Sequence, residues 1–454
     1  AVADVDGDGA LDVFVGGRVV PGRYPAPASS KLYLNHGGRL EADPAASELL
    51  KDVGLVSGAV FSDLDGDGFP ELILACEWGP VRIFRNEHGR LSRWTWRLAA
   101  GEGIAPSDVP ATLDELTGWW AGVAVGDLDG DGKLDLIAAN WGLNSSYHQP
   151  SPAEPARLWY GDLQVSGGMD LVEGESEHGT GAAAGRIVPR RDLAFLGFGW
   201  PGLRARFASH RQFAETDVRG VLGESAGKSR ELRAATLASV ALLQRGDGFV
   251  VAPLPFEAQL APAFAVCVGD LDNDGHEDLF LSQNFFAMRL EEPRLDAGRG
   301  LWLRGKGNGT FVAVPGQESG VKVYGEQRGA ALADFDGDGR VDLVVAQNSG
   351  ATRLYRNTGA KPGLTVRLAG PPGNPSGIGA AMRLLFGSQS GPVRELHAGS
   401  GYWSQDSAVQ VLASREGPSQ IWVRWPGGRV TTSPVPAGAK EIAVNPAGEV
   451  TVRK

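Results

Sequence analysis

The stretch DVDGDGALD at residues 4–12 decides the fold, because four more segments of the chain repeat its pattern without a gap. Aspartate stands at positions 1, 3 and 5, glycine at position 6, and an acid closes the stretch at position 9. The other complete copies are DLDGDGFPE at 63–71, DLDGDGKLD at 127–135, DLDNDGHED at 270–278 and DFDGDGRVD at 334–342. A sixth copy, DLQVSGGMD at 162–170, keeps the spacing but lacks the acids at positions 3 and 5. Self-similarity of this kind is typical of a repeat architecture.

Apolar runs of strand length flank the acidic stretches. VFVGG, LILAC, LIAAN, LFLSQ and LVVAQ follow the five complete copies, and a weaker motif comes later as LYLN at 32–35, IFRN at 83–86 and LYRN at 354–357. An apolar run, an acidic stretch, a second apolar run and the later motif follow one another in most repeats. This succession predicts four short strands in a unit of about 60 residues, which is typical of the blades of an all-β propeller. Six repeats are visible, and a seventh would have to lie at the start of the chain or in the crowded 127–162 region.

The interval after the sixth copy is too long for one unit. It contains PGLRARFASHRQFAETDVRGVLG and SRELRAATLASVALL, which are rich in Arg, Ala, Leu and Glu. Leu203, Phe207, Val218 and Leu222 recur with a roughly helical period. We therefore expect a helical insertion at about 200–240, inside a propeller domain that covers residues 1–360.

The acidic stretches have the composition of calcium loops. In the first copy Asp4, Asp6 and Asp8 place carboxylates on one side of a tight turn, and Gly9 permits the backbone reversal. A backbone carbonyl at position 7 and the acid at position 9 would complete about six or seven oxygen ligands, which suits Ca²⁺ better than Zn²⁺ or Mg²⁺. The expected ligands are Asp4, Asp6, Asp8, Ala10, Asp12, Asp63, Asp65, Asp67, Phe69, Glu71, Asp127, Asp129, Asp131, Lys133, Asp135, Asp270, Asp272, Asp274, His276, Asp278, Asp334, Asp336, Asp338, Arg340 and Asp342.

We expect about five bound Ca²⁺ ions with a structural role. Clustered carboxylates repel each other, so each hairpin needs its ion to close, and metal binding is coupled to folding. The loops differ from EF-hands, because strands flank them and the last ligand stands at position 9 instead of position 12. The copy at 162–170 should bind poorly or not at all. Five dications would bring the formal charge of −11 to about −1, and the acidic balance disfavours a nucleic-acid partner.

The loops, with their flanking strands and glycine-rich turns, resemble the FG-GAP/VCBS repeats of the integrin α-subunit propeller and of bacterial surface proteins. The resemblance covers roughly residues 1–360. It implies a seven-bladed propeller, with the calcium loop between the first two strands of each blade. It also implies that the acids of each copy are the calcium ligands, and Glu71 departs modestly from the aspartate found at position 9 elsewhere.

A second resemblance covers the C-terminal part, residues 361–454. NPSGIGAAMRLLF at 374–386, RELHAGSGYWSQDS at 394–407 and IWVRWPGG at 421–428 resemble the ASPIC/UnbV module. This module follows such repeats in bacterial proteins and in the cartilage acidic protein group. The resemblance implies a small all-β domain and a secreted or surface-located, calcium-binding protein involved in adhesion or interaction.

A partner site is expected on the propeller face opposite the calcium loops. Loops on that face begin beside aromatic and amide residues, which can recognise a sugar or a peptide. We hypothesise a ligand-binding rim at Trp78, Trp141 and Phe286. The alternative is that these aromatics pack between blades. For the segment GSGYWSQD at 399–406, a hairpin connection is favoured over a functional role.

Three functions remain open, and a recognition or adhesion module is favoured over the other two. Its partner would be a protein or glycan on a cell surface or matrix, and calcium loops of this kind fill best outside the cytosol, at the cell surface or in a periplasm. The alternative is a structural subunit of a larger surface or envelope assembly. We expect no enzyme, since the chain has no Walker, CxxC or HExxH motif; a polysaccharide-acting enzyme is the least favoured of the three. Cys76 and Cys267 are expected to be buried free thiols, and the sequence has no membrane span.

Overall fold

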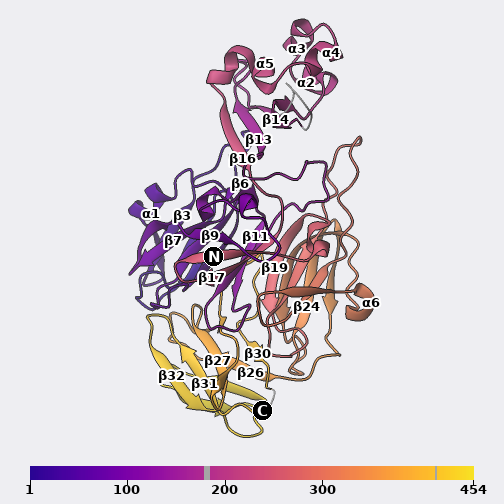
Figure 1. Cartoon of the computed structure of the whole chain (residues 1–454). Helices are drawn as coiled ribbons and strands as arrows, with labels where there is room; N and C mark the ends of the chain where they lie inside the picture. The colour runs from indigo at the N-terminus through magenta and orange to yellow at the C-terminus, as the bar shows by residue number, and fades with distance from the viewer. Residues whose placement is uncertain (178–184, 415–416) are drawn as a thin grey trace.

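Each complete acidic stretch forms the turn between the two innermost strands of one antiparallel sheet. The computed structural model describes residues 1–177, 185–414 and 417–454, and all five turns lie among them (Figure 1). The five hairpins share one register, in which the residue before position 1 pairs with the acid at position 9. The pairs are Ala3 with Asp12, Ser62 with Glu71, Gly126 with Asp135, Gly269 with Asp278, and Ala333 with Asp342.

Blades 1 and 2 start from four consecutive strands each, whereas blade 3 is split by an insertion, and blades 2 and 3 each gain an extra strand. Blade 1 contains β1 (Val2–Ala3), β2 (Asp12–Val15), β3 (Lys31–His36) and β4 (Arg39–Ala42), and is followed by helix α1 (Pro44–Leu49). Blade 2 contains β5 (Leu55–Ser62), β6 (Glu71–Pro80), β7 (Arg82–Glu87), β8 (Arg90–Trp94) and, beside the far end of β6, β10 (Thr117–Trp119). Blade 3 contains β11 (Gly122–Gly126), β12 (Asp135–Ala139), β17 (Val240–Arg245), β18 (Gly248–Pro253) and the parallel edge strand β9 (Arg97–Ala100).

The last two blades follow without a large insertion. Blade 4 contains β19 (Ala263–Gly269), β20 (Asp278–Gln283), β21 (Leu301–Gly305) and β22 (Phe311–Val314). The short helix α6 (Gly316–Ser319) leads to blade 5, which contains β23 (Glu326–Ala333), β24 (Asp342–Asn348) and β25 (Gly350–Tyr355). Separate hydrophobic clusters fill the spaces between blades 1 and 2, 2 and 3, 3 and 4, and 4 and 5. The predicted all-β propeller class is therefore confirmed, but the described residues form five blades and not the favoured seven.

Blade 3 is interrupted between β12 and β17 by an insertion that projects from the propeller (Figure 1). Its described residues include a four-stranded sheet and four short α-helices. These are β13 (Ala156–Gly161), β14 (Asp170–Ser176), β15 (Ile187–Pro189), α2 (Leu193–Gly199), α3 (Gly202–Arg206), α4 (His210–Ala214), α5 (Val218–Leu222) and β16 (Arg230–Ala234).

The insertion corrects two sequence-based predictions. The sixth acidic copy at 162–170 is the β13–β14 turn and so belongs to the insertion sheet, not to a blade. The helices lie within 193–222, whereas part of the helix-favouring stretch at 229–243 forms strands β16 and β17. Strand β17 is the third strand of blade 3 and is buried on both faces, so packing overrides the helical propensity of its Ala and Leu residues.

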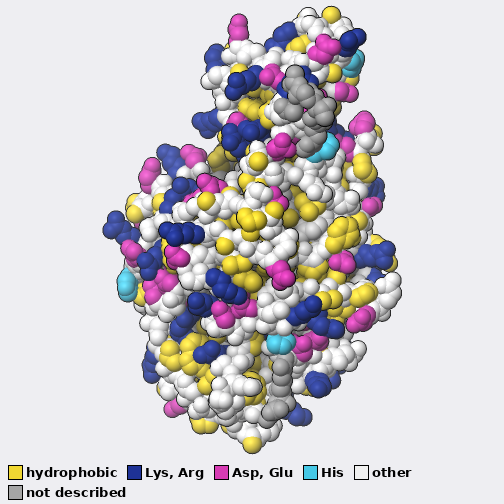
Figure 2. Space-filling model, in the orientation of Figure 1, with side chains coloured by type: hydrophobic (Ala, Val, Ile, Leu, Met, Phe, Trp, Pro, Cys, Tyr) yellow, Lys and Arg dark blue, Asp and Glu magenta, His cyan; other side chains and the backbone are white. Residues whose placement is uncertain are grey.

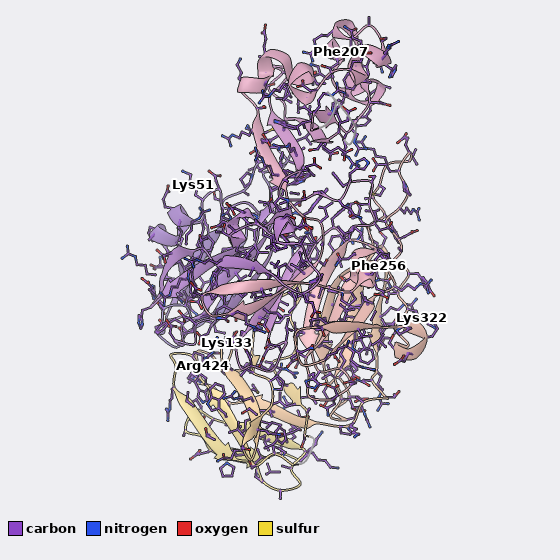
Figure 3. All side chains as sticks on the ribbon, in the orientation of Figure 1. Lys51, Lys133, Phe207, Phe256, Lys322 and Arg424 are labelled. Carbon is purple, nitrogen blue, oxygen red and sulfur yellow. The ribbon has the colours of Figure 1, made fainter. Side chains whose placement is uncertain are left out.

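The C-terminal part forms two further sheets on the side of the acidic loops. One contains β30 (Gln410–Leu412), β26 (Leu364–Leu368), β33 (Glu441–Val444) and β34 (Val450–Val452). The other contains β28 (Gln389–Ser390), β27 (Ala381–Phe386), β29 (Arg394–Glu395), β31 (Gln420–Arg424) and β32 (Val430–Pro434). Lys133 of the third acidic loop and Arg424 of β31 are labelled close together where these sheets meet the propeller (Figure 3). The acidic-loop face of the propeller is therefore covered by the chain itself.

Residues 394–406, here called the axial segment, run from the C-terminal sheets into the centre of the propeller. The backbone of Gly401 donates to Val123 O of blade 3 at 2.8 Å, and Val2 of blade 1 donates to Ala398 O at 2.8 Å. The segment reaches blade 5 through Ser404, whose Oγ accepts from the backbone of Ala330 at 3.1 Å. The GSGYWSQD stretch thus contains the expected hairpin reversal, in which the backbone of Ser400 donates to Ser404 O at 3.1 Å, and it also contacts blades 3 and 5.

Candidate metal centres

The first and ninth positions of each acidic loop are held by the same backbone hydrogen bonds in all five copies. The N–H of the position-6 glycine donates to the position-1 aspartate at 2.7–3.1 Å. The N–H at position 2 donates to one carboxylate oxygen of position 9 at 2.8–3.0 Å. These bonds orient both carboxylates toward the inside of the turn, and each oxygen keeps a lone pair for a further partner.

The second oxygen of the position-9 acid is bound by the third strand of the same blade. The donors are the backbone N–H groups of Asn35, Asn86, Gln244, Gly305 and Asn357, at 2.7–3.2 Å. Three of these residues end the LYLN, IFRN and LYRN motifs, so those motifs mark the strand that fixes the last acid of the loop. The position-9 acids are at most 2% exposed.

The side chains of these third-strand amides also connect neighbouring blades. Asn86 Nδ2 of blade 2 donates to Val5 O in the loop of blade 1 at 2.8 Å. Gln244 of blade 3 reaches Leu64 O at 3.2 Å, and Asn357 of blade 5 reaches Leu271 O at 2.7 Å. In blade 4 the backbone N–H of Gly309 donates to the loop of blade 3, at Leu128 O and 3.1 Å. The first four acidic loops are thereby tied to the next blade, a role that the sequence motifs did not reveal.

The acids at positions 3 and 5 lie on the solvent side of each loop. Carboxylate oxygens of Asp4, Asp6 and Asp12 come within 4.8 Å of one another. Three further sets meet the same limit: Asp63 with Asp65 and Glu71; Asp127 with Asp129 and Asp135; and Asp270 with Asp272 and Asp274. In loops 2 to 5 an arginine from the third strand, or just after it, pairs with the position-3 acid, as Arg85 does with Asp65 at 2.9 Å and Arg304 with Asp272 at 2.7 Å. These arginines reduce the excess negative charge that four carboxylates would retain around one dication.

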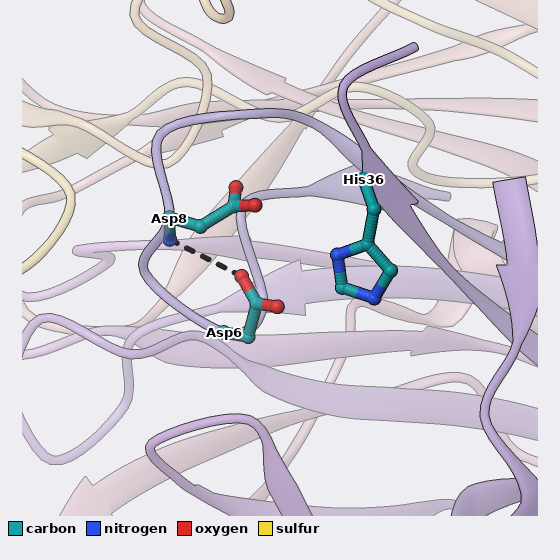
Figure 4. A group of neighbouring side chains, drawn as sticks. All are labelled: Asp6, Asp8 and His36. Atoms are coloured by element: carbon teal, nitrogen blue, oxygen red, sulfur yellow. Dashed lines mark hydrogen bonds between the residues drawn. The ribbon is translucent and has the colours of Figure 1, made fainter. Parts of the chain in front are cut away.

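The first loop has a histidine near its outer acids. His36 extends from β3 toward Asp6 and Asp8 (Figure 4), and one ligand atom from each of the three lies within 4.8 Å of the others. The backbone of Asp8 donates to Asp6 Oδ1 at 3.1 Å. Sequence reasoning did not select His36, because it lies 24 residues beyond Asp12 and only the pairing of β2 with β3 brings it to the loop.

Burial makes these carboxylates costly to ionise without a cation. Desolvation raises the pKa of Asp127 to about 7 and that of Asp135 to about 8, with repulsion from neighbouring acids as a smaller contribution. Desolvation, with repulsion from Asp65 next, raises the pKa of Glu71 to about 9. In addition, Asp127 Oδ1 is buried without a hydrogen-bond partner. An oxygen-only ligand set with a buried, unpartnered carboxylate oxygen fits a hard dication such as Ca²⁺.

The position-7 residues take part in the loops through their backbone. The N–H groups of Ala10, Phe69, Lys133, His276 and Arg340 donate to the position-5 acids at 2.8–3.0 Å. That their carbonyls ligate calcium stays a prediction. The ring of His276 is half-buried and lies against Gly307, where any added side chain would contact it.

The incomplete copy at 162–170 has an amide side chain where the complete copies have the position-3 acid. It keeps the register of the blade loops, because Gly161 pairs with Asp170. Gln164, at position 3, donates through its backbone to Asp170 Oδ2 at 3.0 Å and through its side chain to Oδ1 at 2.6 Å. Both oxygens of the last acid accept N–H groups, as they do in the complete copies, so the difference lies in the acids missing at positions 3 and 5, and the weak binding or absence of binding at this copy stays a prediction.

The expected rim of exposed aromatics is not formed. Trp78 and Trp141 are 3% and 8% exposed, and Trp119 lies between them with ring-centroid distances of 5.3 and 4.2 Å. Phe286 is half-buried beneath the guanidinium of Arg294. Both tryptophans are buried, but they pack against the insertion strands, in one cluster with Leu158 of β13 and Ala234 of β16, and not simply between blades. Cys76 and Cys267 are free and buried, as expected.

Comparisons with known proteins agree with this architecture. The FG-GAP-like repeat family matches residues 4–74, 63–138, 294–345 and 334–382, and the family ASPIC and UnbV matches residues 370–450. The fourth acidic loop, at 270–278, lies outside the matched ranges but shares their hydrogen bonds. The chain therefore contains FG-GAP repeats in a β-propeller, followed by an ASPIC/UnbV domain.

Within that class, the chain is a distant homologue of cartilage acidic protein 1. It is 25% identical to the protein of Xenopus tropicalis over 311 residues, covering 67% of this chain and 42% of the relative. It is 24% identical to the Mus musculus protein over 302 residues, covering 66% and 41%. The chain thus spans about two fifths of the length of these relatives.

Solved structures show a weaker likeness. BBS1N, crystallised in complex with ARL6DN, has a TM-score of 0.26 at 10% identity, covering 97% of this chain and 92% of that one. Bacillus licheniformis rhamnogalacturonan lyase PL11 has a TM-score of 0.28 at 13% identity, covering 95% and 70%. In the part of the chain that the structure describes, no helix has the length and apolar character needed to cross a membrane.

Replacing one buried position-1 acid should remove one calcium ion. In Asp127→Asn the unpartnered carboxylate of the third loop loses its charge, so we expect the bound calcium to fall by about one equivalent out of about five. Equilibrium dialysis followed by elemental analysis measures this directly. The matched control is Asp162→Asn, the same change at position 1 of the incomplete copy, which should leave the calcium content unchanged. Equal losses in both variants would contradict the assignment.

Proposed function

We propose that this chain is a calcium-binding propeller of the cell exterior or cell surface, which recognises a protein or glycan there and takes part in adhesion. The observation that carries the proposal is the common frame of the five acidic loops, in which buried carboxylates are oriented by identical backbone bonds. Loops of this ligand set fill at the millimolar calcium found outside cells. Calcium then acts as a structural element that stiffens the blades.

The arrangement of the chain supports recognition on one face of the propeller. The C-terminal sheets cover the acidic-loop face, where Gly427 donates to Gly68 O at 2.9 Å and Arg424 contacts Asp63 at 3.0 Å. The opposite face carries the blade loops and the insertion, and it is where a partner has access. The distant homology to cartilage acidic protein 1 supports the same setting, an extracellular protein.

The test is saturable binding that depends on calcium. Purified chain is applied to arrays of matrix proteins and glycans, in buffer with calcium and in buffer with EGTA. We expect binding to a defined subset of the array with calcium and a loss of at least tenfold with EGTA, because the blade loops that present the binding face lose their order. Asp127→Asn should weaken binding, and Asp162→Asn should not.

Two other results would contradict the proposal. Recovery of the chain only in a stoichiometric complex that covers the face opposite the acidic loops would favour a structural subunit of a surface or envelope assembly. Cleavage of a polysaccharide on the array, seen as release of new chain ends, would make the chain an enzyme.

A further inference from the structure

A cavity of about 470 Å³ lies on the propeller face opposite the acidic loops. The second strand of each blade starts at an acidic loop, so the residues that follow the end of this strand lie at the opposite face of the propeller. Trp141, which follows β12, and Phe285, which follows β20, are two such residues. The insertion supplies a second wall with Tyr147, Glu173 and Arg190. Tyr402 of the axial segment also lines the cavity. This volume is within the range of small-molecule sites, roughly 300–1,000 Å³.

The cavity is rich in charged side chains, with arginine in excess. Figure 2 shows Lys and Arg side chains on the insertion near its junction with the propeller. Five arginines and three glutamates line the cavity, and Arg328 is also paired with Glu326 just behind the lining at 2.7 Å, which leaves one arginine in excess. The residues are Arg18, Arg190, Arg191, Arg289 and Arg328, and Glu77, Glu173 and Glu292. An excess of guanidinium groups in a concave site favours an anionic ligand.

All three glutamates already have partners. Glu173 Oε1 accepts from the Tyr147 hydroxyl at 3.2 Å, and its Oε2 forms longer ion pairs with Arg190 Nε at 3.6 Å and Arg191 Nη2 at 3.5 Å. Glu77 accepts from Arg18 and from Tyr24 at 2.7 Å each, and Glu292 pairs with Arg191. These ion pairs hold the walls of the cavity together, because they join segments far apart in the sequence. They therefore explain part of the charge without a ligand, and the groups that remain decide what the cavity binds.

Arg190 is the group that the protein leaves incomplete. Its side chain is 6% exposed, its Nη2 donates to Ser146 Oγ at 2.6 Å, and its guanidinium lies 3.7 Å from the centre of the Tyr147 ring. Its Nε and Nη1 are buried and have no hydrogen-bond partner; Glu173 Oε2, at 3.6 Å from Nε, is too far to accept. Buried N–H groups of a charged side chain are costly to leave unpaired. An oxyanion of a ligand would supply the missing acceptor.

The part of the cavity around Arg190 also contains a hydrogen-bond acceptor and an apolar wall. Glu173 Oε2 is itself buried without a hydrogen-bond partner, so a ligand that carries hydroxyl groups would satisfy it. Trp141, Phe285 and Met288 line the cavity and suit the C–H face of a ring. An anion without hydroxyl groups would be repelled by Glu173. An anion that carries hydroxyl groups matches the Arg190 guanidinium, the Glu173 carboxylate and the apolar wall.

We propose that this cavity binds an acidic sugar of the uronic-acid type, roughly one or two rings long. Its carboxylate accepts from Arg190, its hydroxyl groups donate to Glu173, and its ring packs on the apolar wall. The inference rests on the proposed function, because it names the glycan that the recognition face would take. A phosphorylated sugar offers an oxyanion of similar size, and the experiment separates the two.

The test is titration calorimetry of the full chain with digalacturonate at a fixed free calcium concentration. We expect digalacturonate to bind, the neutral disaccharide galactobiose not to bind, and inorganic phosphate to compete weakly. Arg190→Met removes two charge-assisted hydrogen bonds and should weaken binding by at least tenfold. Arg429→Met, at an exposed arginine of the C-terminal sheets, is the matched control and should bind as the wild type does.

A second variant keeps the inference testable if Arg190→Met folds poorly. Met288→Trp fills the cavity while leaving its charges in place, and it should also abolish binding. Three results would overturn the inference: phosphate or a phosphorylated sugar binding in place of digalacturonate, digalacturonate binding unaffected by both variants, or no binding of digalacturonate at all. In the last case, calcium-dependent binding of the wild type to arrays of matrix proteins and glycans would show that the proposed function stands without this ligand.

Discussion

Exhaustive removal of calcium should lower the thermal unfolding midpoint of the chain by on the order of 10 °C. Extracellular calcium modules bind with dissociation constants of about 10⁻⁴–10⁻³ M, so at about 2 mM calcium each site adds roughly 0.7–1.8 kcal/mol to the free energy of unfolding. Five such sites contribute about 3–9 kcal/mol, which is comparable to the whole stability of many domains. Differential scanning calorimetry in calcium and in EGTA measures the change.

The controls for this prediction separate calcium from general ionic effects. EGTA saturated with calcium should leave the midpoint unchanged, and magnesium at the same concentration should restore only part of it, because Mg²⁺ demands a stricter octahedron. A midpoint that does not move after exhaustive chelation would contradict the structural role of calcium. It would also leave unexplained the buried and unpartnered Asp127 Oδ1.

Loss of calcium should affect the whole propeller and not single hairpins. Asn86 donates both to Pro70 O in its own loop and to Val5 O in the loop of blade 1, so movement of one loop disturbs the next blade. The backbone N–H of Val393, which leads into the axial segment, donates to Asp127 at 2.8 Å. One cooperative transition in the absence of calcium is therefore expected, since neighbouring loops share their hydrogen-bond partners.

The local part of this structure was predictable from the sequence. The acids of each loop follow one another within nine positions, and the hairpin register that places Asp12 opposite Ala3 is a consequence of the turn. The LYLN, IFRN and LYRN motifs were visible, but their meaning was not, because Asn86 contacts Val5 across 81 residues. Spacing within a motif does not reveal a partner in the preceding blade.

The arrangement of parts far apart in the sequence was not predictable. The copy at 162–170 looks like a blade loop because it keeps the β-hairpin register, and only the pairing of β13 with β16 shows that it belongs to a separate sheet. The axial segment contacts Ser62, Val123 and Ala330, each more than 70 residues away. The cavity is likewise assembled from blade ends, the insertion and Tyr402. A single sequence contains no periodic signal for such contacts.

Replacement of Arg394 should give the largest loss of stability from any single side chain discussed above. Its guanidinium forms a bidentate pair with Glu277 at 2.8 and 2.9 Å and also donates to Val411 O at 2.8 Å. The side chains are 10% and 1% exposed. Arg394→Met leaves the Glu277 carboxylate buried and unpaired beside the fourth acidic loop, which should cost about 3–5 kcal/mol of unfolding free energy in denaturant titrations.

A double-mutant cycle distinguishes this ion pair from general damage to the fold. Glu277→Leu combined with Arg394→Met removes both buried charges, so it should recover most of the stability lost in Arg394→Met. Arg367→Met is the control, since Arg367 pairs with Glu441 at 2.6 Å but is half exposed, and an exposed pair is worth about 0–1 kcal/mol. Additive losses in the double variant would mean that the axial segment is not held by this pair. Recovery would show that the loss in Arg394→Met comes from the buried, unpaired Glu277 carboxylate, so that this pair joins the ASPIC/UnbV domain to the blade 4 loop.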